Sequence, residues 1–86
     1  MFKIFFEERI VKDFDRLPFE DAVKIRKIIE LLYNEPRPRG SKKLKGKGSL
    51  YRIRQGDYRM VYEINNKNKE IRLIMVKHRK EAYRQL

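Results

Sequence analysis

The chain has 86 residues, a length that accommodates one hydrophobic core but not two independent ones. It has 23 lysines and arginines against 12 aspartates and glutamates, so the formal net charge is +11 at pH 7. A small domain this basic is typical of proteins that bind an anionic partner, most often a nucleic acid. The lack of cysteine and the single histidine exclude disulfides, thiolate chemistry, cysteine-bound zinc and a His-rich metal site. We expect a single domain over residues 1–86, without a metal or other cofactor.

The positive charge is concentrated in the second part of the chain. Residues 1–35 carry seven basic and eight acidic side chains, whereas residues 36–86 carry sixteen basic and four acidic ones. We therefore expect residues 1–35 to have a mainly structural role and residues 36–86 to form the anion-binding surface. The apolar run at the start, MFKIFF, is too short for a signal peptide or a membrane span. We expect a cytoplasmic protein with no membrane partner.

The first part of the chain predicts a strand followed by a short helix. Residues 2–6 are aromatic and β-branched, which favours a strand. Residues 7–17 have apolar side chains at i, i+4 and i+7, the spacing of one helix face. These side chains are Ile10, Phe14 and Leu17.

A second helix is expected to begin at Pro18 and to end before Pro36. The two helices form a hairpin whose apolar stripes require a sheet to pack on. The residues expected on the outer surface of the second helix are Lys24, Arg26, Lys27 and Glu30. Its expected inner face consists of Ala22, Ile25, Ile28, Ile29 and Leu32.

The second part of the chain predicts a basic loop and three strands. Residues 36–49 contain two prolines, three glycines and six basic residues without an acidic side chain. A solvated linker is the alternative interpretation of this loop, but a second basic cluster nearby favours phosphate contact. Strands are expected over residues 50–54, 57–64 and 70–78. The expected fold class is α+β: an N-terminal strand, an α-helical hairpin and a three-stranded antiparallel sheet.

The first hairpin allows a prediction about side-chain positions. If residues 55–56 form the turn, Arg54 pairs with Asp57, and Arg52 lies directly opposite Arg59. Side chains alternate between the two faces of a strand pair, so these four residues share one face. The other face, expected under the helices, carries Tyr51, Ile53, Tyr58, Met60, Tyr62 and Ile64.

The predicted arginine pair favours a role in binding. Two arginines directly opposite each other repel, so a structural role alone does not explain Arg52 and Arg59. Arg54, by contrast, has a structural explanation in its expected partner Asp57. A guanidinium group offers paired donors to phosphate oxygens and stays charged. We therefore expect Arg52 and Arg59 to bind a phosphate, the alternative being a merely solvated face.

The third strand is expected to pair Ile64 with Ile71. This register brings the segment HRKEAYR, residues 78–84, to the end of the arginine-bearing face. Tyr83 is then an aromatic ring beside basic residues, a combination that stacks a base and holds its backbone. Packing on the core is an equal alternative for Tyr83, and His78 has a structural alternative. The third-strand residues expected on the arginine side are Ile74, Val76 and His78.

Two motifs and the order of the elements carry a family resemblance. The motifs are YRIRQGDYRMVY, residues 51–62, and HRKEAY, residues 78–83. Together they resemble the RelE/ParE superfamily of toxin–antitoxin toxins, over essentially the whole chain. The resemblance implies a RelE-like fold, similar to small microbial ribonucleases. It also implies metal-independent cleavage of messenger RNA in the ribosomal A site by 2′-OH attack, and a RelB-like antitoxin as partner.

The resemblance also implies roles for individual residues. Arg79 matches a position of charge stabilisation or leaving-group protonation, and Tyr83 matches a tyrosine that orients the substrate. Arg52 and Arg54 stand where the best-studied members have lysines, one of them proposed as the general base. Arginine stays protonated and is a poor base, so the base is left open among His78, Glu81, Tyr83 and a ribosomal group. The expected catalytic residues are Arg52, Arg54, Arg59, Arg79 and Tyr83, and the expected RNA-binding residues are Lys42, Lys43, Lys45, Lys47, Lys77, His78 and Lys80.

Two other functions fit the same sequence. A ParE-like inhibitor of DNA gyrase would share the fold but would not cleave RNA. A simple RNA-binding accessory domain would explain the charge but not the arginine set. The arginines together with Tyr83 in the second motif favour the RelE-like nuclease.

Overall fold

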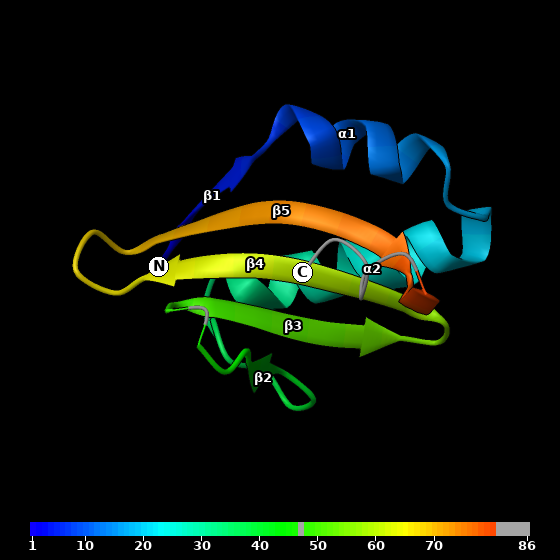
Figure 1. Ribbon diagram of the computed structural model, residues 1–86. Helices are drawn as coiled ribbons and strands as arrows, with labels where there is room; N and C mark the ends of the chain where they lie inside the picture. Colours follow the sequence, from blue (N-terminus) through cyan, green and yellow to red (C-terminus); the bar gives the residue numbers. More distant parts are fainter. Residues whose placement is uncertain (47, 81–86) are drawn as a thin grey trace.

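The structure is a computed structural model that describes residues 1–46 and 48–80 (Figure 1). Its described strands form one sheet in the order β1-β5-β4-β3-β2, with β1 parallel to β5 and the other neighbours antiparallel. In Figure 1, α2 lies behind the sheet and α1 runs along the β5 edge. No described helix is long and apolar enough to cross a membrane. The elements are β1 (Lys3–Phe6), α1 (Glu8–Asp15), α2 (Phe19–Leu32), β2 (Lys42–Lys43), β3 (Leu50–Gln55), β4 (Tyr58–Asn65) and β5 (Glu70–His78).

The two helices confirm the predicted hairpin, with one correction at its turn. Pro18 precedes α2 as the N-cap residue instead of opening the helix, because its ψ of 146° is extended. Its carbonyl accepts the Ala22 N–H at 3.0 Å, as the carbonyl of an N-cap residue does. The predicted outer residues of α2 are all exposed, and its buried residues are Ile25, Ile29 and Leu32.

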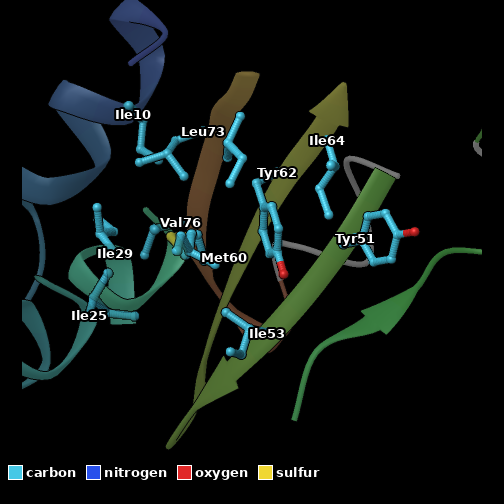
Figure 2. Packing of buried hydrophobic residues seen from close by; sticks show 12 residues of the cluster. Ile10, Ile25, Ile29, Tyr51, Ile53, Met60, Tyr62, Ile64, Leu73 and Val76 are labelled. Atoms are coloured by element: carbon cyan, nitrogen blue, oxygen red, sulfur yellow. The ribbon is translucent and has the colours of Figure 1, made fainter. Parts of the chain in front are cut away.

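The hydrophobic core lies between the sheet and the helices (Figure 2). Ile10 is the core residue from α1, and β3, β4 and β5 supply the larger share. Phe14 and Leu17 pack against this core and are partly buried. The buried cluster consists of Ile10, Ile25, Ile29, Leu32, Tyr51, Ile53, Met60, Tyr62, Ile64, Ile71, Leu73 and Val76.

The sheet has more strands than the sequence predicted, although the α+β class is confirmed. Residues 36–49 are not loop throughout, because Lys42 and Lys43 form β2 opposite Arg52 and Tyr51. Two lysines carry little strand propensity, but lysine is common on edge strands, where its charge discourages further pairing. At the other edge β1 joins the sheet beside β5. The predicted three-stranded sheet is therefore five-stranded.

The turn between β3 and β4 is one residue further along than predicted. Gly56 and Asp57 occupy the turn, and Gln55 pairs with Tyr58 on either side of it. Gly56 has a φ of 60°, and a type II′ turn requires a positive φ at its first central residue. The predicted turn at residues 55–56, with Arg54 paired to Asp57, was therefore wrong.

The observed register changes which arginines face each other. Arg54, not Arg52, lies opposite Arg59, and Arg52 lies opposite Val61. The faces are nevertheless as predicted, because side-chain alternation has a period of two and each residue's partner moved by two. We call the face that carries Arg52, Arg54 and Arg59 the arginine face. The core side carries Tyr51, Ile53, Tyr58, Met60, Tyr62 and Ile64.

Strand β5 begins as predicted, with Ile64 opposite Ile71, and then contains a β-bulge. The register shifts between Val61 and Tyr62, which leaves Ile74 as the extra, unpaired residue. A bulge reverses the alternation of side chains beyond it. The prediction that Val76 and His78 lie on the arginine side was wrong for this reason. Beyond the bulge, Val76 and His78 share the core side, whereas Met75 and Lys77 share the arginine face.

Candidate nucleic-acid interface

The three arginines of the arginine face differ in exposure. Arg54 is exposed, Arg52 is half-buried and Arg59 is only 3% exposed. The Arg59 guanidinium folds back on the β3–β4 turn, where Nη1 donates to the Tyr58 carbonyl at 3.2 Å and to the Gly56 carbonyl at 3.4 Å. The hairpin thus holds this group in a fixed position.

Two guanidinium nitrogens on this face are buried without a partner among the described residues. They are Arg59 Nε and Arg52 Nη1. A buried cationic donor without an acceptor destabilises the protein, and Arg54 opposite Arg59 adds like-charge repulsion. An anionic oxygen is the kind of acceptor that would relieve both costs.

The basic loop extends the positive charge to the sheet edge. Lys42 lies directly opposite Arg52, so both side chains belong to the arginine face. Lys43 pairs with Tyr51 and is exposed, as is Lys45. The structure therefore brings Lys42 next to the arginines. Two predicted site residues, Lys47 and Tyr83, lie outside the described residues. The candidate base Glu81 lies outside them as well.

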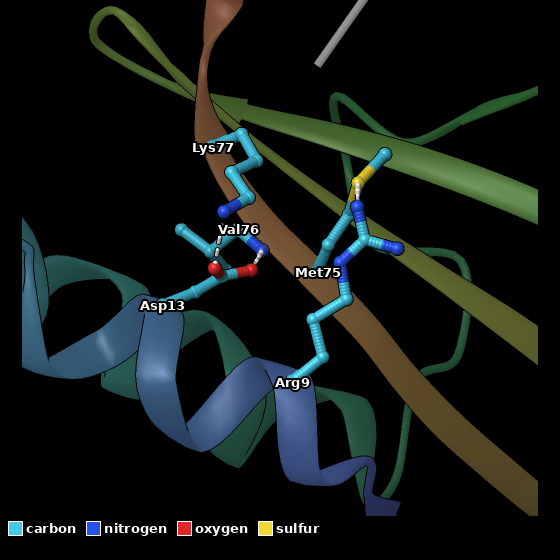
Figure 3. Close-up of polar contacts among 5 residues, drawn as sticks. All are labelled: Arg9, Asp13, Met75, Val76 and Lys77. Atoms are coloured by element: carbon cyan, nitrogen blue, oxygen red, sulfur yellow. Dashed lines mark hydrogen bonds and ion pairs between the residues drawn. The ribbon is translucent and has the colours of Figure 1, made fainter. Parts of the chain in front are cut away.

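Lys77, which the sequence predicts to bind RNA, forms an ion pair with Asp13 (Figure 3). Its Nζ lies 2.6 Å from Asp13 Oδ1, and its side chain is 12% exposed. The second carboxylate oxygen of Asp13 accepts the Val76 N–H at 3.0 Å. Asp13 thus fastens α1 to the edge of β5 and neutralises the charge of Lys77.

Sequence reasoning missed Asp13, although a signal was present. Asp13 lies at i+3 from Ile10, on the apolar side of α1, where a charged residue needs a buried partner. Its partner Lys77 is far away in the sequence, so the pair was not visible there.

At the end of β5, the neighbouring residues His78 and Arg79 lie in different places relative to the sheet. The Arg79 N–H donates to the Asp57 carbonyl at 2.7 Å, which places this exposed arginine beside the β3–β4 turn. His78 lies opposite Tyr58 on the core side, with ring centroids 5.7 Å apart in an edge-to-face arrangement. The exposed Lys80 donates its N–H to His78 Nδ1 at 3.5 Å. Arg79 is therefore near the arginine face, whereas His78 is behind it.

A tyrosine pair anchors the start of the basic loop to the sheet. The Tyr62 hydroxyl donates to the Pro36 carbonyl at 2.9 Å, and Tyr62 stacks on Tyr51 with centroids 6.0 Å apart. Arg37 lies over the Tyr51 ring at 5.2 Å and donates through Nε to its hydroxyl at 3.1 Å. Burial raises the pKa of Tyr62 to about 12, against a lowering by its hydrogen bond with Ser41. The Tyr62 hydroxyl therefore keeps its proton and holds the loop.

Chemically, the described site is a set of fixed cations that suits an anion. Among residues 1–46 and 48–80, no group of three or more His, Cys, Asp or Glu side chains is placed to hold a metal ion. The donors that the arginine face presents are guanidinium and ammonium groups, which match phosphate oxygens.

Comparison with known proteins identifies the family. Residues 4–83 match the family model described as the ParE toxin of the type II toxin–antitoxin system, parDE. The chain is 35% identical over 85 residues to Toxin RelE3 of Methanocaldococcus jannaschii, covering 94% of each protein. It resembles the solved RelE–RelB complex of Pyrococcus horikoshii OT3 at 34% identity, with a TM-score of 0.81 and coverage of 91% of this chain and 94% of that one. The RelB–RelE complex of Methanococcus jannaschii matches at 33% identity, with a TM-score of 0.82 and coverage of 95% and 98%. The chain thus belongs to the RelE/ParE family of type II toxin–antitoxin toxins.

Proposed function

We propose that this toxin is a ribosome-dependent mRNA endonuclease that cleaves in the A site and thereby inhibits translation. The observation that carries the proposal is the arginine face, where Arg52 and Arg59 hold buried guanidinium nitrogens without a described partner. A phosphodiester supplies the oxygens that these donors lack. Kinship with toxins named RelE supports the same activity.

In the proposed reaction the nucleophile is the ribose 2′-OH of the RNA itself. The protein's main task would be to stabilise the negative charge that develops on the phosphate. The ribose 2′-OH loses its proton, its oxygen forms a bond to the adjacent phosphorus, and the 5′-oxygen leaves with a proton. The products are a 2′,3′-cyclic phosphate and a 5′-hydroxyl. Arg52, Arg54 and Arg59 would stabilise the charge that develops on the phosphate, while the ribosome would align the strand for in-line attack.

The general base is not one of these arginines, because guanidinium stays protonated. His78 lies on the core side of the sheet, away from the arginine face. We therefore propose that the proton acceptor comes from the segment with Glu81 and Tyr83 or from the ribosome. Positioning and electrostatics would then provide most of the rate enhancement.

We further propose a RelB-like antitoxin as the partner that neutralises this toxin in the cytoplasm. The solved relatives from Pyrococcus horikoshii and Methanococcus jannaschii are complexes with RelB. In this chain a groove of about 410 Å³ lies between α1, α2 and β1, and it includes the half-exposed Phe6 and Val11. An amphipathic, acidic peptide could fill the groove and cross the basic surface. We expect it to block access to Arg59 directly or through the segment that bears Tyr83.

Primer extension on a defined mRNA in a purified translation system tests the nuclease. The wild-type protein is expected to cut only when ribosomes are present. Arg54→Ala should reduce cutting about 100-fold, the effect of removing one charge-stabilising donor. Lys24→Ala, an equal charge loss at an exposed position of α2, serves as the control and should cut normally. Equal cutting by Arg54→Ala, or equal cutting of RNA without ribosomes, would contradict the proposal.

Gyrase inhibition is the second candidate, because the matching family model is described as a ParE toxin. It would require no cleavage of RNA, so the arginine face would serve only to bind. A DNA supercoiling assay with purified gyrase separates the two functions. Inhibited supercoiling together with intact mRNA would assign the ParE-like function to this chain.

A further inference from the structure

A small cavity lies on the core side of the sheet, where β4 begins and β5 ends. Its volume is about 140 Å³. One water molecule requires about 10–15 Å³ of cavity volume, so this cavity has room for a phosphate group and for water molecules beside it. The lining strand residues Tyr58, Val76 and His78 belong to the core side, whereas Lys77 alternates to the arginine face and its side chain reaches Asp13 of α1. The residues that line the cavity are Asp13, Arg16, Leu17, Tyr58, Val76, Lys77 and His78.

The charges around this cavity favour an anion. Asp13 is fully occupied, since one carboxylate oxygen holds Lys77 Nζ at 2.6 Å and the other accepts the Val76 N–H at 3.0 Å. The Asp13–Lys77 pair therefore adds no net charge. Arg16, at the carboxyl end of α1, is exposed, and its side chain forms no ion pair or hydrogen bond with a described residue. The cavity thus has an uncompensated guanidinium at its margin.

His78 and Tyr58 add donors without negative charge. His78 Nδ1 accepts the Lys80 N–H at 3.5 Å, so in the neutral imidazole the proton lies on Nε2, which is then a donor. Tyr58 contributes a phenolic hydroxyl and packs edge-to-face against the His78 ring. A phosphate in the cavity would meet Arg16, His78 and Tyr58 as donors.

We propose that this cavity is a second phosphate subsite, which binds a phosphate of the RNA strand next to the one at the arginine face. The proposal rests on the endonuclease function proposed above. The exposed Arg79 lies between the two places, because its N–H is bonded to the Asp57 carbonyl of the β3–β4 turn. A single strand that crosses this tip of the sheet would meet Arg79 between the arginine face and the cavity. The substrate is then a single strand that extends beyond the cleaved step.

An NMR titration with inorganic phosphate tests the subsite without any need for cleavage. His78 is the single histidine of the chain, so its ring protons give one unambiguous signal. At constant pH and ionic strength, with chloride as the reference salt, phosphate should shift this signal in a saturable way. Arg16→Gln should weaken binding about tenfold or more, as expected for a charge-assisted hydrogen bond. Arg26→Gln, the same change at an exposed position of α2, should bind as the wild type does.

Further arms separate the possible outcomes. Arg16→Lys keeps the charge and should retain most of the affinity, which guards against a folding defect in Arg16→Gln. A short 2′-O-methyl RNA, which cannot be cleaved by 2′-OH attack, should shift the same His78 signal when it is added without free phosphate. No saturable shift, or equal affinity in Arg16→Gln and Arg26→Gln, would overturn the subsite. RNA that leaves the His78 signal of the phosphate-free protein unshifted would assign free phosphate as the ligand and overturn the RNA path. A phosphate shift without ribosome-dependent cleavage would leave the subsite in place and refute the endonuclease alone.

Discussion

Arg59 carries a permanent positive charge and is nevertheless almost completely buried. Its Nη1 is bonded to the turn carbonyls, its Nε has no described partner, and Arg54 lies directly opposite. Each feature except the turn bonds destabilises the free protein. Residues that cost stability in the free state are typical of sites that gain it back when a ligand binds.

Tyr62 gives a prediction about stability at the residue scale. Replacing it by phenylalanine removes the donor to the Pro36 carbonyl and should lower the free energy of unfolding by about 1 kcal/mol at neutral pH. Urea unfolding of the two proteins measures this difference. Tyr33→Phe is the control, since the Tyr33 hydroxyl has no hydrogen bond in the described part of the chain.

The same residue makes stability depend on alkaline pH. Burial raises the pKa of Tyr62 from 10.0 to about 12, so the folded protein holds this proton more tightly than the unfolded chain does. The contribution is complete below pH 10 and is lost as the pH rises from 10.0 through about 12. Wild-type stability should therefore fall more steeply over this range than that of Tyr62→Phe. Parallel curves for the two proteins would contradict this linkage.

Among the elements, α1 completes the edge of β5 that β1 leaves open. Strand β1 pairs with β5 only as far as Phe6 and Leu73. Beyond that point, Asp13 in α1 accepts the Val76 N–H that a neighbouring strand would otherwise bind. A helix side chain thus replaces a strand partner and keeps the edge covered.

Asp13→Asn should loosen this attachment of α1 to β5. The variant leaves Lys77 nearly buried without a counter-charge, and the free energy of unfolding should fall by about 3 kcal/mol. Lys77→Met in the same chain removes the unpaired charge and should restore part of the loss. Urea denaturation of the single and double variants checks both, with the exposed Asp15→Asn as control. A loss in Asp13→Asn no larger than in Asp15→Asn would show that the ion pair is not needed.

The sequence predicted well those features of the structure that depend on local patterns of side chains. The apolar spacing of α2 identified its inner face, and alternation placed Arg52, Arg54 and Arg59 on one face even though their partners were wrong. The turn at Gly56 and the bulge at Ile74 depend on single-residue differences in backbone torsion, which apolar patterns do not report. Because of the bulge, the positions of Lys77 and His78 in the candidate site could not be derived from alternation.

At the scale of the whole molecule, cationic groups from two segments meet on one side of the sheet. The basic loop places Lys42 beside Arg52, and the β3–β4 hairpin adds Arg54 and Arg59. These segments supply most of the excess charge of the chain, whereas residues 1–35 have nearly balanced charges. Binding to a polyanion should therefore depend strongly on salt.

This dependence can be measured with a labelled single-stranded RNA by fluorescence anisotropy at several KCl concentrations. Each phosphate contact contributes about 0.7 to the slope of log affinity against log salt. Lys42→Ala combined with Lys43→Ala should reduce the magnitude of that slope by about 1.4 if both lysines contact phosphates. Lys24→Ala with Lys27→Ala, exposed on α2, should leave it unchanged. If both double variants show the same slope of log affinity against log salt, the RNA does not contact Lys42 and Lys43.

The position of β5 between β1 and β4 has a consequence for how the toxin is made. During synthesis, β1, both helices and the β3–β4 hairpin emerge before β5. Lys3 in β1 therefore cannot pair with Glu70 until β5 has been made. Contacts so distant in sequence form slowly, because a long loop must close first. A nascent chain without β5 carries the arginines of the hairpin but lacks the strand that connects this hairpin to α1. A chain with this topology completes its five-stranded sheet only after nearly all of its described sequence has been translated.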